Sequence, residues 1–175
     1  MVYTGNGKGK TTAALGAVFR ALGHGWRVAV IQFVKGDWPI VYGEQESAKK
    51  FQENGQLLFV QKGTGFVRIM GDKKPIETHI HAAKEALKFA ESCIRDPEYD
   101  LVVLDELNGA IEGGLLEVSS VIEVLSKRPE RNHIIMTGRR AAPEVIEMAD
   151  LVTEMMEIKH PFKEKKIPAQ IGIDY

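Results

Sequence analysis

Apolar residues gather along the chain in short runs that alternate with longer amphipathic stretches. The runs are typical of strands buried on both faces of a sheet, and they occupy residues 2–3, 27–34, 57–60, 101–104, 134–137 and 151–155. Apolar positions at helical spacing between them predict helices after residue 12 and over residues 44–53, 75–95, 118–125 and 143–149. This alternation predicts an α/β fold, with a mainly parallel sheet covered by helices on both faces.

The same alternation predicts where a ligand binds. In open parallel sheets, ligands occupy the crevice at the carboxyl ends of the strands. We therefore expect the functional residues in the loops that follow the apolar runs, at residues 4–12, 35–43, 61–74, 105–114 and 137–142.

The first of these loops is rich in glycine and reads TGNGKGKTT over residues 4–12. Such a loop turns backbone N–H groups around a phosphate, and the N-terminus of the following helix adds a positive dipole. Lys10 can reach phosphate oxygens, and the Thr11 hydroxyl can hold Mg²⁺. The loop predicts a P-loop NTPase (RecA-like) fold. The residues expected to bind the nucleotide are Gly5, Asn6, Gly7, Lys8, Gly9, Lys10, Thr11 and Thr12.

This phosphate loop departs from the strict pattern at one position. The pattern places a glycine six residues before the lysine, whereas this chain has Thr4 there and Gly5 beside it. The loop is a variant, and the triphosphate is free to follow a different path from the usual one.

Two acidic residues end another apolar run. The sequence LVVL over residues 101–104 is followed by Asp105 and Glu106. A buried strand would deliver both carboxylates to the edge of the sheet that carries the phosphate loop, where they can bind Mg²⁺ directly or through water. Glu106 is also placed to polarise a water molecule, so this pair is compatible with an ATPase.

A third strand end carries arginines. Thr137 and Gly138 are followed by Arg139 and Arg140. An arginine at this edge can neutralise phosphate charge, and we expect Arg139 to do so. Arg140 is expected in solvent or in a surface ion pair.

The composition of the chain is typical of a globular protein and not of a membrane or nucleic-acid-binding protein. The 175 residues are 44% hydrophobic and 27% charged, with a net charge of −1. These values predict a single globular domain over residues 1–175, with an extended C-terminal tail from about residue 159. The near-neutral charge gives no general attraction to nucleic acid or to membranes. No apolar run reaches membrane-spanning length and no signal peptide is recognised, which favours the cytoplasm. The histidines at positions 79 and 81 are expected at the surface.

Several segments together resemble the ATP:corrinoid adenosyltransferases of the P-loop type. They occur in the order typical of that family and cover nearly the whole chain. They are residues 4–12 (TGNGKGKTT), 32–36 (QFVKG), 65–66 (GF), 103–107 (VLDEL), 137–139 (TGR), 152–160 (VTEMMEIKH) and 169–175 (AQIGIDY). The phosphate loop alone is unspecific, and the segments beginning at Gln32 and Ala169 make the match specific.

The resemblance implies an enzyme, a cob(I)yrinic acid a,c-diamide adenosyltransferase. Co(I) of a reduced corrinoid (cobalamin, cobinamide or a cobyrinate derivative) would attack C5′ of ATP, and triphosphate would leave. ATP would lie in the loop in the reversed sense. The implied catalytic residues are Lys10, Phe66 and Glu106, and the implied metal ligands for Mg²⁺ or Mn²⁺ are Thr11, Asp105 and Glu106. A flavoprotein reductant and a homodimer are also implied.

Phe66 belongs to a loop that the family writes as G-F-x-W and that is thought to press on the lower face of the corrin. Arg68 stands where that pattern has tryptophan, a departure that bears on corrinoid choice. Trp38 lies in another candidate loop and suits either the site or the core. Two other functions remain open, namely a P-loop ATPase or small-molecule kinase, and a non-catalytic module that binds ATP or a corrinoid.

Overall fold

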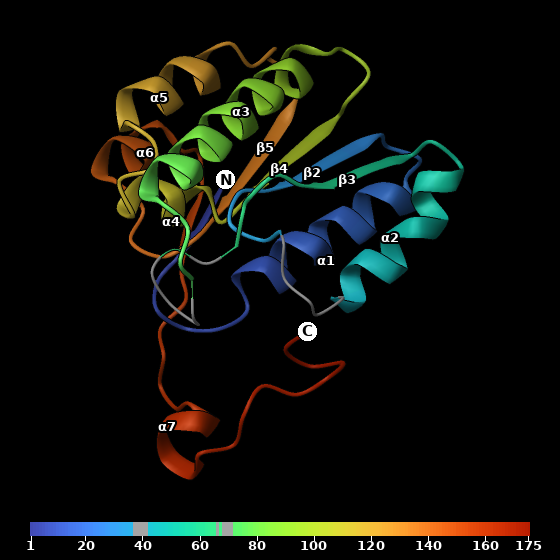
Figure 1. Cartoon of the computed structure of the whole chain (residues 1–175). Coiled ribbons are helices and arrows are strands. Elements are labelled where there is room, and N and C mark those ends of the chain that lie inside the picture. Colours follow the sequence, from blue (N-terminus) through green and yellow to red (C-terminus); the bar gives the residue numbers. More distant parts are fainter. Residues whose placement is uncertain (37–41, 66, 68–71) are drawn as a thin grey trace.

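The protein folds around one parallel sheet, and the computed structural model describes residues 1–36, 42–65, 67 and 72–175. All six strands of the sheet run parallel in the order β3-β2-β4-β5-β1-β6 (Figure 1). The strands are β1 (Val2–Thr4), β2 (Val28–Gln32), β3 (Leu57–Gln61), β4 (Leu101–Asp105), β5 (His133–Thr137) and β6 (Val152–Glu154). The parallel α/β prediction is therefore confirmed.

Helices cover both faces of the sheet, as the apolar pattern predicts. They are α1 (Lys10–Gly23), α2 (Gly43–Glu53), α3 (Ile76–Arg95), α4 (Leu107–Glu112), α5 (Val118–Ser126), α6 (Pro143–Met148) and α7 (Pro161–Lys165). Helices α1 and α2 lie on one face, and α3 to α6 lie on the other (Figure 1). Helix α7 stands away from the sheet.

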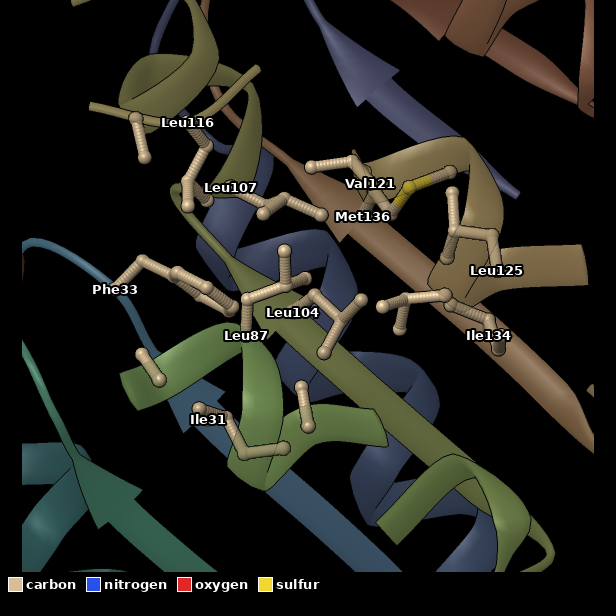
Figure 2. Packing of buried hydrophobic residues seen from close by; sticks show 14 of the residues in the cluster. Ile31, Phe33, Leu87, Leu104, Leu107, Leu116, Val121, Leu125, Ile134 and Met136 are labelled. Carbon is tan, nitrogen blue, oxygen red and sulfur yellow. The ribbon is translucent and has the colours of Figure 1, made fainter. Parts of the chain in front are cut away.

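Two buried clusters hold these layers together, because alternate residues of a strand point to opposite faces. On β2, Val28 and Val30 pack with α1, whereas Ala29 and Ile31 pack with α3. The cluster on the α3 side is the larger one, and it also includes Leu104 and residues of α5 and β5, as Figure 2 shows. Burial on both faces explains why the central strands read as continuous apolar runs.

Two short helices were not predicted. Helix α4 occupies part of the expected loop 105–114, and α7 interrupts the expected extended tail. Helix α4 has six residues, too few for a periodic apolar pattern to appear. Helix α7 begins at Pro161, a residue that suits the first helical position, and the Nδ1 atom of His160 accepts the Phe162 N–H at 3.2 Å.

The prediction of surface histidines is wrong for His79, whose exposed fraction is only 3%. Its Nδ1 lies 2.8 Å from the Thr64 hydroxyl, and its Nε2 lies 3.0 Å from an oxygen of Asp72. Both partners come from the loop before α3, so the sequence pattern of the helix alone did not reveal them. His81 is exposed, as expected. No helix within the described ranges is long and apolar enough to cross a membrane.

Candidate active site

The glycine-rich loop joins β1 to α1 at the carboxyl edge of the sheet, where the predicted site lies. Its backbone is fixed against the segment that follows β6. The Gly7 N–H donates to the Met155 carbonyl at 2.6 Å, and the Met155 N–H donates to the Thr4 carbonyl at 2.8 Å. Gly9 has φ of 106°, a left-handed conformation that glycine adopts without strain. The loop is therefore held in shape by strand-like pairing on one side.

Close packing predicts a large effect of a methyl group at Gly7. A Cβ atom there would lie 2.7 Å from the carbonyl oxygens of both Met155 and Met156, so the backbone must shift. We expect Gly7→Ala to destabilise the fold by about 1–3 kcal/mol and to weaken ATP binding at least ten-fold. Urea unfolding and calorimetric ATP titration measure the two effects.

Gly16 supplies the matched control, because it lies within α1 with open space around its Cβ position. Gly16→Ala should stabilise the protein by up to about 1 kcal/mol and leave ATP binding unchanged. Equal behaviour of the two variants would contradict the packing explanation.

Thr4, at the position where the strict pattern has glycine, has a structural role of its own. Its side chain is buried at 7% exposure. The hydroxyl accepts the backbone N–H of Ala141 at 3.0 Å. Thr4 therefore ties the end of β1 to the loop after β5, which contains Arg139.

Lys10 is the first residue of α1 and is 7% exposed. Its Nζ donates to the carbonyls of Gly5 at 2.8 Å and Gly7 at 2.7 Å. Burial lowers the pKa of Lys10, while the carboxylates of Glu106 and Asp105 oppose that shift and Arg139 adds to it. The ammonium group of Lys10 therefore lies across the loop. A phosphate oxygen bound there can take the place of one of these carbonyl oxygens as its hydrogen-bond acceptor.

Asp105 is the centre of a buried hydrogen-bond network, with an exposed fraction of 0%. Its Oδ1 accepts from the hydroxyls of Thr11 at 2.8 Å and Thr137 at 2.6 Å. Its Oδ2 accepts from the amide of Gln32 at 2.8 Å, and the oxygen of that amide accepts from Gln61 at 2.8 Å. The network joins the ends of β2, β3, β4 and β5 to the start of α1.

Glu106 lies beside this network in a left-handed backbone conformation with φ of 62°. Its N–H donates to the Thr137 hydroxyl at 2.9 Å. Burial raises the pKa of the Glu106 carboxyl, the charge of Asp105 raises it further, and Lys10 offsets part of the rise. The site therefore holds a carboxyl group that is costly to ionise until a cation approaches.

The raised pKa predicts a pH-dependent stability difference between the wild type and Glu106→Gln. A carboxyl group with a raised folded-state pKa stabilises the fold below its unfolded pKa, near 4.3, and this contribution is lost as pH rises through the folded pKa. Glu106→Gln should therefore melt higher than the wild type at pH 7, and the two should converge near pH 4. Thermal melts from pH 4 to 8 test this, and a wild type that melts higher at pH 7 would contradict it.

Lys35 is a neighbour of the site to which no role was assigned from the sequence. Its Nζ lies 2.9 Å from an oxygen of Glu44 and 4.4 Å from the centre of the Tyr42 ring. Burial lowers the pKa of Lys35, but the charge of Asp105 and the hydrogen bond to Glu44 outweigh burial and raise it overall. Lys35 therefore stays protonated at neutral pH and adds a positive charge beside the phosphate loop.

A cavity of about 520 Å³ lies between the phosphate loop and the starts of α1 and α2. Most of the residues expected to bind the nucleotide line it, and these are Gly7, Lys8, Gly9, Lys10, Thr11, Thr12 and Arg139. Glu106, which was expected as a catalytic residue and metal ligand, lines it as well. Asn6 instead lines a neighbouring cavity of about 590 Å³, which Arg139 shares. Gly5, within the loop, and Asp105 are both buried and line neither cavity.

Three candidate residues cannot be compared with this cavity, whereas one segment at the end of the chain contributes to it. Phe66, Arg68 and Trp38 lie outside the described residues. Residues 172–175 line the cavity although they are far from the loop in sequence. From the sequence, an extended tail of this kind could fold across the site or across a subunit partner, and the structure places its last four residues at the site.

The fold and the phosphate loop together define a protein of the P-loop nucleotide-binding class. In agreement, the chain resembles the crystal structure of flagellar accessory protein FlaH from Methanocaldococcus jannaschii, with a TM-score of 0.51 at 11% identity over 87% of this chain and 68% of that one. This likeness concerns the fold alone.

Sequence comparison is more specific. Residues 1–175 match the family model of ATP:corrinoid adenosyltransferase BtuR/CobO/CobP, and the chain belongs to that family. It is 42% identical to a corrinoid adenosyltransferase of Pseudomonas aeruginosa, over the whole chain and 82% of that protein. It is 38% identical to one of Escherichia coli K12 and 37% to one of Salmonella typhimurium, over the whole chain and 84% of each. The resemblance found in the sequence is thus confirmed.

Proposed function

We propose that this protein transfers the 5′-deoxyadenosyl group of ATP to Co(I) of a reduced corrinoid and releases triphosphate. The observation that carries the proposal is the family match over the whole chain. The phosphate cavity, with Lys10 across its loop, agrees with it.

The reaction needs alignment and charge stabilisation more than proton transfer. An electron pair of Co(I) forms the new bond to C5′, the C5′–O bond breaks, and its electrons leave with the triphosphate. We infer that ATP lies in the reversed sense, with its nucleoside end toward the corrinoid. Lys10, Lys8, Arg139 and the loop amides would then offset the charge that develops on the leaving triphosphate.

The residues present fit Mg²⁺, or Mn²⁺ in its place. Oxygen ligands are the ones that Mg²⁺ prefers, and it is usually held by one or two carboxylates plus substrate phosphates. The Thr11 hydroxyl lies 2.8 Å from Oδ1 of Asp105, and Glu106 lines the cavity beside them. Thr11, Asp105 and Glu106 would hold the ion, which when bound neutralises phosphate charge.

The corrinoid side of the site rests on the resemblance. We assign Phe66 to contact with the lower face of the corrin, which favours loss of the axial ligand and reduction of Co(II). A separate flavoprotein would supply the electron. We further propose a single-domain, cytoplasmic homodimer.

The decisive experiment mixes the protein with Mg-ATP and chemically reduced cob(I)alamin under anaerobic conditions. Adenosylcobalamin, followed by its visible spectrum, should form with an equal amount of triphosphate. Release of ADP or phosphate instead would indicate an ATPase or kinase, which the half-buried Glu106 beside Asp105 would suit. Bound ATP with no adenosylated product from cobalamin or cobinamide would indicate a non-catalytic binding module.

A further inference from the structure

The 170–175 segment returns to the phosphate cavity from a distant part of the fold. The chain leaves the sheet after β6, forms α7 and comes back to lie below α1 and α2 (Figure 1). Residues 172–175 then line the same cavity as the phosphate loop. One side of the cavity is therefore built by residues that are distant from the loop in sequence, since Lys8 and Asp174 are 166 positions apart.

Asp174 organises this segment. Its Oδ2 accepts the Gln170 N–H at 2.8 Å, and the N–H groups of Asp174 and Ile173 donate to the Gln170 carbonyl at 2.8 and 3.2 Å. Its Oδ1 forms an ion pair with Lys8 of the phosphate loop. A single carboxylate therefore closes the turn of the segment and also ties that turn to the loop.

The two partners of this ion pair are exposed to different degrees. The Asp174 side chain is 14% exposed, whereas that of Lys8 is 51% exposed. The hydrogen bond from Lys8 and the Gln170 N–H lower the pKa of Asp174, so it stays ionised at neutral pH. An ammonium group has three donors, so Lys8 can keep Asp174 as a partner while it donates to a phosphate.

The volume that remains indicates that the segment bounds the cavity and does not fill it. With residues 172–175 in place the cavity still measures about 520 Å³, within the range of small-molecule sites. The loop residues that share this cavity with the segment run from Gly7 to Thr12. The part of a ligand that the segment faces is therefore the polyphosphate.

We propose that Asp174 is a positioning residue of the nucleotide site. Through Lys8 it holds the 170–175 segment as a wall over the polyphosphate, which slows the loss of ATP and of the triphosphate product. This inference rests on the proposed function in taking ATP as the substrate and triphosphate as the product.

Asp174→Asn tests the wall, because the amide keeps the size of the side chain and removes its charge. Inorganic triphosphate and ATP, each with Mg²⁺, are titrated calorimetrically, and their dissociation rates are measured by stopped flow. We expect both ligands to bind roughly five-fold more weakly. The weaker binding should come from faster dissociation, and the melting temperature of the protein should not change. Equal effects on the two ligands identify the polyphosphate as the part that the wall contacts.

Two further variants separate a specific role from a general effect on the tail. Glu164→Gln removes an exposed carboxylate of the same tail that lines neither this cavity nor the neighbouring one, and should leave triphosphate binding unchanged. Lys8→Met should weaken binding at least as much as Asp174→Asn. If Asp174 acts through Lys8, the double variant should bind no more weakly than Lys8→Met alone.

Three results would overturn the proposal. Tighter triphosphate binding by Asp174→Asn would show that the carboxylate competes with the ligand for Lys8. Unchanged binding, or no triphosphate binding by the wild type, would show that the segment is no wall of a polyphosphate site. Neither ligand titration needs a corrinoid, so a positive result here combined with no adenosyl transfer would reject the proposed function and leave the wall intact.

Discussion

Replacement of Lys10 by methionine is expected to lower kcat/KM for ATP by about 10³-fold, the upper range for loss of one group that stabilises transition-state charge in a site from which water is excluded. Lys10 is buried, and its Nζ is held at 2.7–2.8 Å from two carbonyls of the phosphate loop. Because the leaving group is the whole triphosphate, loss of this cation should reduce turnover as well as binding. Anaerobic adenosylation rates at varied ATP concentration give both parameters.

Lys49→Met is the matched control for this substitution. Lys49 is an exposed lysine of α2 that pairs with Glu46, and exposed pairs of this kind contribute little. The control should retain wild-type kcat/KM, and circular dichroism should show that both variants are folded. A Lys10→Met enzyme with unchanged kcat and a raised KM would mean that Lys10 binds ATP equally in the ground and transition states.

The sequence predicts that the phosphate-side candidates lie at one edge of the sheet, because strand ends and loop chemistry are local signals. Lys10, Thr11 and Asp105 each follow from a short pattern, and the rule that ligands bind at strand ends places them together. The structure agrees, with Thr11 bonded to Asp105 across 94 positions of sequence. Strand β5 lies between β1 and β4, so this contact is made from the first turn of α1.

The partners of Asp105 follow from strand order, which the pattern leaves open. Gln32 faces Asp105 because β2 pairs with β4 in the register that aligns these two residues. A polar residue at the end of an apolar run gives no sign of its neighbour until that register is known. The burial of His79 and the return of the 170–175 segment to the site could not be predicted for the same reason. Both depend on contacts with residues of other segments of the chain.

The network around Asp105 makes Asp105→Asn the second substitution with a large expected effect. An ionised carboxylate only accepts hydrogen bonds, whereas an amide offers one acceptor oxygen and two donors. The new NH₂ group would face either the Gln32 amide donor or the hydroxyls of Thr11 and Thr137. Gln32 cannot turn to accept without losing its bond from Gln61. The first orientation leaves a mismatched, buried donor. In the second, hydroxyls that now donate to a carboxylate must accept from the amide instead. Either way the hydrogen bonds to an ionised acceptor are lost, so we expect a loss of about 1–3 kcal/mol of unfolding free energy.

Asp105→Asn should also remove the benefit of Mg²⁺ for ATP binding and lower kcat by at least 10²-fold, if Asp105 helps to hold the ion. Asp100→Asn provides the control. Asp100 directly precedes β4, at the end of the strand opposite to Asp105, and it accepts a hydrogen bond from the Arg27 N–H. That variant should lose some stability and keep its Mg²⁺ dependence. Titrations of ATP with and without Mg²⁺, together with urea unfolding, separate the two roles of Asp105. A variant that is destabilised but binds Mg-ATP like the wild type would restrict Asp105 to the network and move the metal to Thr11 and Glu106.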